Sequence, residues 1–216
     1  MSCISDSSLS LAQCTLSGNH ADATGGGVFV SGSLAVTVDN CILWNDTAPE
    51  GPEILIYADP STLAVGYSNI EGGEEGIGGG DSVIWGDGNV DADPLFVDPS
   101  GSDLRLLSGS PCIDSGDNTA VPPDSGDLDG DGDTDEPIPV DLDGAPRFAD
   151  DAGTPNSGNP DGVHPIVDMG AYEQEGMQCW DDDDDGHWYV FDHSDDAKVG
   201  FPHPGGAKGD KATVVL

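Results

Sequence analysis

The chain contains very few basic residues. Of its 216 residues only 5 are Lys or Arg, against 42 Asp or Glu, which gives a formal net charge of −37. Residues 1–100 contain no Lys or Arg at all. Binding to nucleic acids or to anionic membranes depends on clustered cations, so the composition excludes both kinds of partner. A lyase acting on acidic sugars also needs basic groups around the substrate, so residues 1–100 carry no site of that type.

Long apolar stretches are also absent. No hydrophobic run is long enough to span a bilayer, and the start of the chain lacks both the basic and the apolar part of a signal peptide. The sequence therefore predicts no membrane insertion. So much negative charge opposes a compact state unless cations neutralise it, and extracellular fluid supplies calcium. We expect a secreted or cell-surface protein, with this chain as the C-terminal part of a longer exported protein; a small acidic cytosolic protein is the alternative.

A repeat of 27 residues is the strongest pattern that the chain does contain. Residues 9–16, 36–43 and 63–70 carry apolar side chains at equivalent positions, and the run 28–30 aligns with residues 55–57 at the same step. A fixed period of this size indicates one unit stacked on copies of itself. Leu9 and Leu11 alternate with polar neighbours, as in a strand with one buried face. The next apolar pair, Cys14 and Leu16, is shifted by one residue, as a bend would produce.

Short strands separated by glycine-rich corners predict an all-β fold. Each 27-residue repeat would form one coil of a right-handed parallel β-helix, with glycines at 25–27 allowing a sharp corner. Helical repeats would be broken by these glycines, and the asparagine-containing pattern of leucine-rich repeats is absent. We expect about three coils over residues 1–92. An irregular acidic region that caps the β-helix is expected over 93–175, and an acidic loop with a tail over 176–216.

The cysteines and arginines lead to separate expectations. Cys14 and Cys41 share one position of the repeat, and we interpret them as stacked free thiols because in-register stacking suits a disulfide poorly. A disulfide or a metal site is the alternative there, and a Cys112–Cys179 disulfide remains open. Arg105 and Arg147 are the only basic residues before residue 198. Each is expected to bridge to a carboxylate, and the candidate partners are Asp114, Asp143 and Asp168.

A first acidic loop has the spacing of calcium ligands. Carboxylates occupy every second residue from Asp127, and a glycine stands at the sixth position. This spacing lets one tight loop wrap oxygens around a calcium ion. The candidate ligands are Asp127, Asp129, Asp131, Asp133, Asp135 and Glu136. The twelfth position is Ile138, so Glu136 or Asp141 would have to substitute, and the loop resembles the acidic loops of thrombospondin type 3 repeats more than an EF-hand.

A second acidic run lies near the C-terminus and has a related pattern. It contains a glycine at position 186 and an aspartate at the twelfth position. Its candidate ligands are Asp181, Asp183, Asp185 and Asp192. This pattern resembles the calcium loops of dockerin modules, and the alternative is a solvated run of charge. Extracellular loops of this type bind calcium at about 10⁻⁴–10⁻³ M.

Several short strings resemble a known family. They are Asp-Pro-Leu-Phe at 93–96, Ser-Pro-Cys-Ile-Asp at 110–114, Asp-Gly at 143–144 with Arg147, and Asp-Met-Gly-Ala-Tyr-Glu at 168–173. In this order they resemble bacterial surface proteins in which a right-handed parallel β-helix precedes a choice-of-anchor type region, and residues 41–45 resemble the family's last coil. The resemblance implies an exported protein with a surface-attachment signal at its C-terminus. It implies no activity.

These patterns together favour a calcium-stabilised module with a structural, adhesive or carbohydrate-binding role at the cell surface. Trp44, Tyr67 and Trp85 could stack on a polysaccharide or a cell-surface matrix, although corner packing explains them equally well. The alternative is a fragment of a glycoside hydrolase or polysaccharide lyase whose active site lies on upstream coils. A hydrolase needs two carboxylates facing one groove. The 27-residue step pairs none of the acids available on the coils, so we assign no catalytic residue; these acids are Asp39, Asp46, Glu53 and Asp59.

Overall fold

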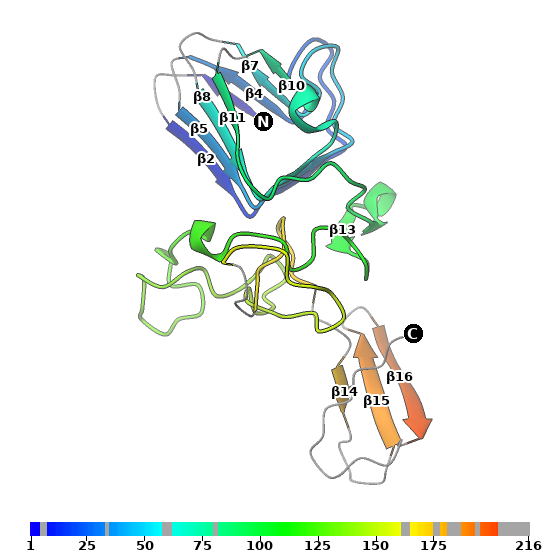
Figure 1. Ribbon diagram of the computed structural model, residues 1–216. Coiled ribbons are helices and arrows are strands. Elements are labelled where there is room, and N and C mark those ends of the chain that lie inside the picture. The colour runs from blue at the N-terminus through cyan, green and yellow to red at the C-terminus, as the bar shows by residue number, and fades with distance from the viewer. Residues whose placement is uncertain are drawn as a thin grey trace.

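Three parallel sheets form a coiled stack in the computed structural model of the chain (Figure 1). The structure describes residues 1–4, 8–32, 35–57, 62–79, 82–160 and 165–174, and the backbone of three later strands. The first sheet contains β1 (Ser2–Ile4), β4 (Val28–Ser31), β7 (Ile54–Ile56) and β10 (Ile77–Gly79). The second contains β2 (Ser8–Ala12), β5 (Ala35–Asp39), β8 (Thr62–Gly66) and β11 (Ser82–Trp85). The third contains β3 (Thr15–Ser17), β6 (Ile42–Trp44) and β9 (Asn69–Ile70).

The strands of the second and third sheets pair in the register that the repeat predicts. Leu9 pairs with Val36 and Val36 with Leu63, while Leu16 pairs with Leu43, each at a step of 27 residues. The predicted parallel β-helix is therefore confirmed. Its interior is a single apolar cluster of Leu11, Val28, Val30, Val36, Val38, Cys41, Leu43, Ile54, Ile56, Leu63, Val65 and Ile70. Burying each large apolar side chain contributes about 1.5–3 kcal/mol.

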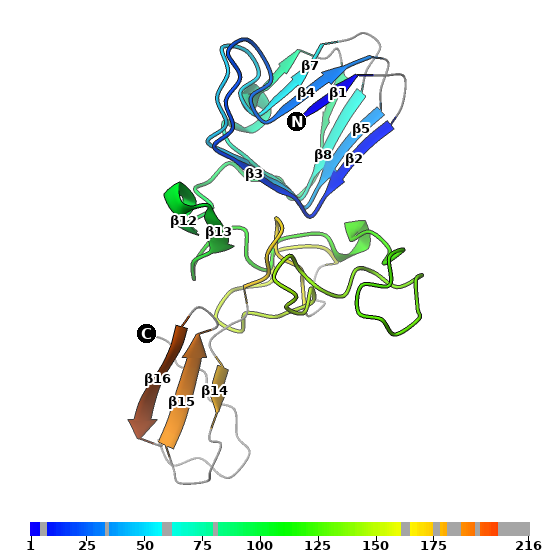
Figure 2. The ribbon, with the colours of Figure 1, turned by 180° about the vertical axis from the view of Figure 1, so that it is seen from behind.

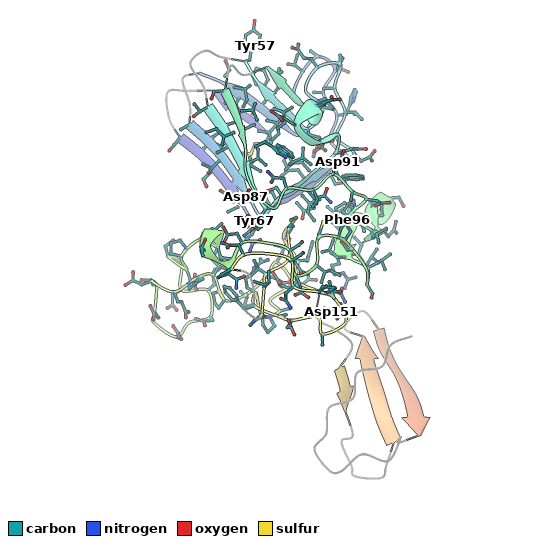
Figure 3. The ribbon with its side chains drawn as sticks, viewed as in Figure 1. Tyr57, Tyr67, Asp87, Asp91, Phe96 and Asp151 are labelled. Atoms are coloured by element: carbon teal, nitrogen blue, oxygen red, sulfur yellow. The ribbon has the colours of Figure 1, made fainter. Side chains whose placement is uncertain are left out.

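The first sheet departs from the predicted alignment by one residue. Val28 pairs with Ile54, a step of 26 residues, whereas the sequence comparison aligned Val28 with Leu55. Residues 54–57 are all apolar, so the hydrophobic pattern permitted both registers. A slip of one residue moves every side chain to the opposite face. The observed register leaves Tyr57 71% exposed at the rim of the stack (Figure 3), where its ring stacks beside Phe29 at a centroid distance of 6.3 Å.

Two kinds of corner connect the sheets. The corner between the second and third sheets uses one left-handed residue in each coil, with φ of 53°, 52° and 45° at Gln13, Asn40 and Tyr67. These three residues share one position of the repeat. The glycine corner has a different cause, because it brings backbone close to a neighbouring loop. A Cβ on Gly27 would lie 2.4 Å from Asp46 Oδ2, so only glycine fits there.

Residues 93–174 lie beside a corner of the coils, as both views show (Figures 1 and 2). Their regular elements are short: β12 (Phe96–Asp98), β13 (Asp103–Leu106) and the 3₁₀ turns η2 (Pro99–Gly101) and η3 (Asn118–Ala120), with η1 (Gly73–Gly76) in the coils. Asn40 joins the two parts, because its side-chain amide donates to Asp117 O (2.8 Å) and its Oδ1 accepts from Asp117 N (2.6 Å). At the first coil, Ala171 N donates to Thr15 Oγ1 (3.0 Å).

A second apolar cluster fills the contact between the coils and residues 93–174. It consists of Ile42, Phe96, Leu106, Cys112, Ile113 and Met169, with Trp44, Tyr67, Val90 and Leu104 packed against it. Trp44 and Tyr67 thus take part in packing at the corner, and Trp85 packs against the coil interior. These contacts agree with the packing interpretation of the three aromatic residues.

Both arginines form carboxylate bridges, but the partners expected from the sequence are wrong. Arg105 Nε donates to Asp103 Oδ1 (2.9 Å), two residues away on β13. Arg147 Nη1 donates to Glu173 Oε1 (3.0 Å), and both of these side chains are buried. Asp168, which had been a candidate partner, accepts two backbone N–H groups instead. Local strand geometry and the path of residues 147–173 select these partners, and neither can be derived from composition.

Three antiparallel strands follow: β14 (Gln178–Trp180), β15 (His187–Asp192) and β16 (Asp195–Pro202). The division of the chain at residues 92 and 175 stays a prediction. Among the described residues, no helix has the length and apolar character needed to cross a bilayer.

Candidate metal centre

The acidic loop at residues 124–136 is closed at its base by backbone pairing. Asp124 N donates to Glu136 O (2.7 Å), and Ile138 N donates to Pro122 O (2.9 Å). Pro123 and Pro137 form an antiparallel bridge between these two bonds. We call this base, with the acids Asp124 and Glu136, the neck of the loop. The backbone therefore holds two carboxylates face to face where the chain enters and leaves the loop.

The remaining part of the loop is shaped by carboxylate-to-backbone bonds. Asp131 N donates to Asp129 Oδ1 (3.2 Å), Asp133 N to Asp131 Oδ1 (2.7 Å) and Asp135 N to Asp133 Oδ1 (3.0 Å). The glycine at the predicted sixth position, Gly132, has a φ of +91° and donates its N–H to Asp127 Oδ1 (3.0 Å). Glycine is suited to this left-handed conformation because it has no Cβ. Alternating aspartates thus fold the backbone into successive tight turns.

The structure gathers five acids of this loop into two overlapping groups. In each group, one oxygen per carboxylate lies within 4.8 Å of the others. The tip group contains Asp127, Asp129 and Asp131, and the neck group contains Asp124, Asp129 and Glu136. Asp129 belongs to both. Oxygen clusters of this kind could hold a metal ion, and hard divalent cations prefer such ligands.

The neck group contains a buried carboxylate that the sequence comparison missed. Asp124 is 1% exposed; its Oδ2 accepts from Leu128 N (2.7 Å), but its Oδ1 is buried and meets no donor among the described residues. Glu136 is half-exposed, yet its Oε1 is also shielded from solvent without a described donor. Desolvation and the neighbouring carboxylates, first Asp131 and then Asp129, raise the pKa of Glu136. Asp124 breaks the alternating pattern that begins at Asp127, so only its position at the neck reveals it.

The other predicted ligands lie outside these groups. Asp133 and Asp135 belong to neither group, although both are exposed in the same loop. Asp181, Asp183 and Asp185 of the second acidic run lie outside the described residues. Asp192 is the last residue of β15, where the structure describes the backbone. The second loop therefore stays a prediction.

A buried carboxyl pair lies in the coils, away from the acidic loop. Asp46 and Glu53 are 3% and 1% exposed, and Asp46 N donates to Glu53 Oε1 (3.2 Å). Asn19 donates its backbone and side-chain N–H to Asp46 Oδ1 (2.6 and 2.9 Å), whereas Asp46 Oδ2 and Glu53 Oε2 are buried without a described donor. Burial, and then the Asp46 carboxylate, raises the pKa of Glu53 to about 9. One proton shared by the pair stabilises it at neutral pH.

This pair was missed because its members are seven residues apart and the repeat relates residues 27 apart. Close approach of Gly27 to Asp46 fills the space beside the pair. The two acids are therefore packed inside the fold and do not face a groove, which is the arrangement that a glycoside hydrolase requires. We interpret them as a structural proton-sharing pair.

The cysteines of the described residues are free thiols. Cys14 and Cys41 stack as expected, each thiol donating to the carbonyl two residues earlier (both 3.2 Å). The Cys41 thiol also donates toward Cys14, which lowers the pKa of Cys14 to about 7. Cys112 is a buried free thiol, and its Sγ accepts from Asn69 Nδ2 (3.1 Å), so the Cys112–Cys179 disulfide left open by the sequence is wrong.

The fold and this centre together define a parallel β-helix protein with acidic groups able to hold a metal ion. Comparison with known proteins adds no name to that class: no family model, no curated protein and no solved structure matches the chain.

Proposed function

We propose that this chain is a calcium-stabilised β-helix module with a structural role in a secreted or cell-surface protein. The observation that supports it is the convergence of five carboxylates into two overlapping groups in one loop. Their formal charge is −5, and the two arginines of the described residues pair elsewhere, with Asp103 and Glu173. Uncompensated carboxylates at such short range repel one another, and divalent cations remove that repulsion.

Calcium suits these groups better than other common metals. All the ligand atoms in both groups are carboxylate oxygens, with no Cys or His, which disfavours zinc and copper. Calcium accepts six to eight oxygens in flexible geometry, whereas magnesium demands a near-ideal octahedron. The resemblance of residues 93–173 to choice-of-anchor proteins, and of the acidic loop to thrombospondin type 3 repeats, favours the same extracellular setting, where calcium is abundant. An adhesive or carbohydrate-binding role has no comparable support in the described residues.

Thermal unfolding of the chelator-treated full chain tests this proposal. With about 5 mM calcium and dissociation constants of about 10⁻⁴–10⁻³ M, each occupied site should stabilise the fold by about 1–2 kcal/mol. Sodium chloride at matched ionic strength is the control, because a chain of charge −37 also responds to screening. Equal concentrations of magnesium should give a smaller shift. If calcium and the sodium control shift the melting temperature equally, and calorimetry detects no binding, the proposal is wrong.

A further inference from the structure

We infer that the tightest calcium site of this chain is at the neck of the loop, with Asp124, Asp129 and Glu136 as ligands, and not at the tip, which the sequence pattern favours. This inference rests on the proposed calcium function and assigns the ligand set. Asp124 lies outside the alternating motif, so the neck differs from the predicted ligand set in its central residue.

The first argument concerns the oxygens that have no donor. At the tip, each aspartate uses an oxygen to accept a backbone N–H: Asp127 from Gly132, Asp129 from Asp131, and Asp131 from Asp133. At the neck, Asp124 Oδ1 and Glu136 Oε1 are shielded from solvent and accept from no donor among the described residues. A buried acceptor without a partner is costly, and a buried charge more so. Binding a cation therefore relieves a larger penalty at the neck than at the tip.

The second argument concerns preorganisation. Asp124 is anchored through its Oδ2 to Leu128 N (2.7 Å), and its backbone is fixed to Glu136 by the bond at the base of the loop. The tip aspartates Asp129 and Asp131 are exposed on a loop that only local turns hold. Ligands that are already positioned lose less conformational freedom on binding, which increases affinity.

The third argument concerns the connection of the neck to the coils. The segment that enters the neck begins at Asp117, which is bonded to Asn40 at the coil corner, and continues through η3 and the buried Val121. An ion at the neck therefore stabilises a segment that is attached to the β-helix. An ion at the tip would act only on exposed turns.

Four single substitutions of the full chain, each removing one negative charge from this loop, test the assignment by calorimetric calcium titration. Asp124→Asn and Glu136→Gln change the neck, Asp131→Asn changes the tip, and Asp133→Asn is the matched control from neither group. We expect each neck variant to weaken the tightest calcium affinity at least about 10-fold, since an anchored ligand is lost, and the tip and control variants to weaken it less than about 3-fold. Asparagine keeps an acceptor for Leu128 N, and circular dichroism with thermal unfolding checks that each variant folds.

The outcomes separate this inference from the proposed function. If the unchanged chain binds no calcium, the proposed function itself fails. If it binds calcium but Asp131→Asn weakens binding as much as Asp124→Asn or more, calcium binding stands and the neck assignment is overturned. Glu136→Gln supplies the same test should Asp124→Asn fail to fold.

Discussion

The coils and the acidic region beside them are held together by different interactions. The coil interior is an apolar cluster whose members recur along the chain at the step of the repeat. In residues 93–174, buried carboxylates perform much of this work by accepting backbone N–H groups. Asp141, for example, accepts from Asp143, Ala145 and Glu173 N–H (2.9, 2.8 and 2.9 Å). The comparison shows that a chain without α-helices among its described residues satisfies its backbone either by strand stacking or by acidic side chains.

The strongest test of this comparison removes the buried cation of the acidic region. Arg147→Met leaves Glu173 buried without its ion-pair partner, so the variant should lose about 3–5 kcal/mol of unfolding free energy. Arg105→Met is the matched control, because Arg105 and its partner Asp103 are partly exposed, and it should cost about 0–1 kcal/mol. Urea denaturation measures both. Equal losses in the two variants would show that the buried bridge is not essential to the region.

A core substitution tests the coil half of the comparison. Leu43 is fully buried, and Leu43→Ala should destabilise the chain by about 2–5 kcal/mol by creating a cavity between neighbouring coils. Leu142→Ala, at a side chain that is 66% exposed in the acidic region, should change stability by at most about 0.5 kcal/mol. Denaturant unfolding followed by circular dichroism gives both values. A similar cost at the two positions would remove the distinction between an apolar core and a carboxylate-held region.

A smaller effect is expected from the proton-sharing pair, which is the one place where the coils depend on a buried carboxyl. The pKa of Glu53 is raised from 4.5 to about 9, so the folded state holds a proton between these values that the unfolded state releases. The unmodified chain should therefore lose stability as pH rises from about 4.5 to about 9. Glu53→Gln keeps a neutral donor at every pH and should be more stable by about 1–3 kcal/mol near pH 8, with no advantage below about pH 4.

Thermal unfolding from pH 4 to pH 9 measures the effect on this pair. Glu71→Gln, which removes a nearby acid that is half-exposed and accepts from Asn45 N, is the control and should show only a weak pH dependence. A Glu53→Gln profile parallel to that of the unmodified chain would mean that Glu53 is ionised in the fold.

Much of the coil region could be predicted because one rule applies to every coil. Stacking places residue i over residue i+27, so the apolar positions of three coils reinforce one another in the sequence. The prediction was wrong by one residue in the first sheet, where continuous apolar residues left the register to the loops. The left-handed corner at Gln13, Asn40 and Tyr67 also repeats, but its three side chains share no chemistry that would reveal it.

The metal centre was predicted only in part. Alternating aspartates indicated the loop, and Asp127, Asp129 and Asp131 do converge there. The pattern also included Asp133 and Asp135, which lie in neither group, and it omitted Asp124. Ligand spacing in a sequence describes one turn of backbone, whereas the neck is formed by two strands that meet from opposite ends of the loop.

By itself, then, the sequence determined the stacked apolar core, the exclusion of polyanionic partners and the position of an acidic loop. These follow from periodicity and charge, which are properties of the chain before it folds. Only the tertiary structure decided that Asp124 belongs with Glu136, that Glu53 shares its proton with Asp46, and that Arg147 pairs with Glu173. The physical reason is burial: it gives these polar groups few partners to choose from, and those partners lie at no fixed spacing along the chain.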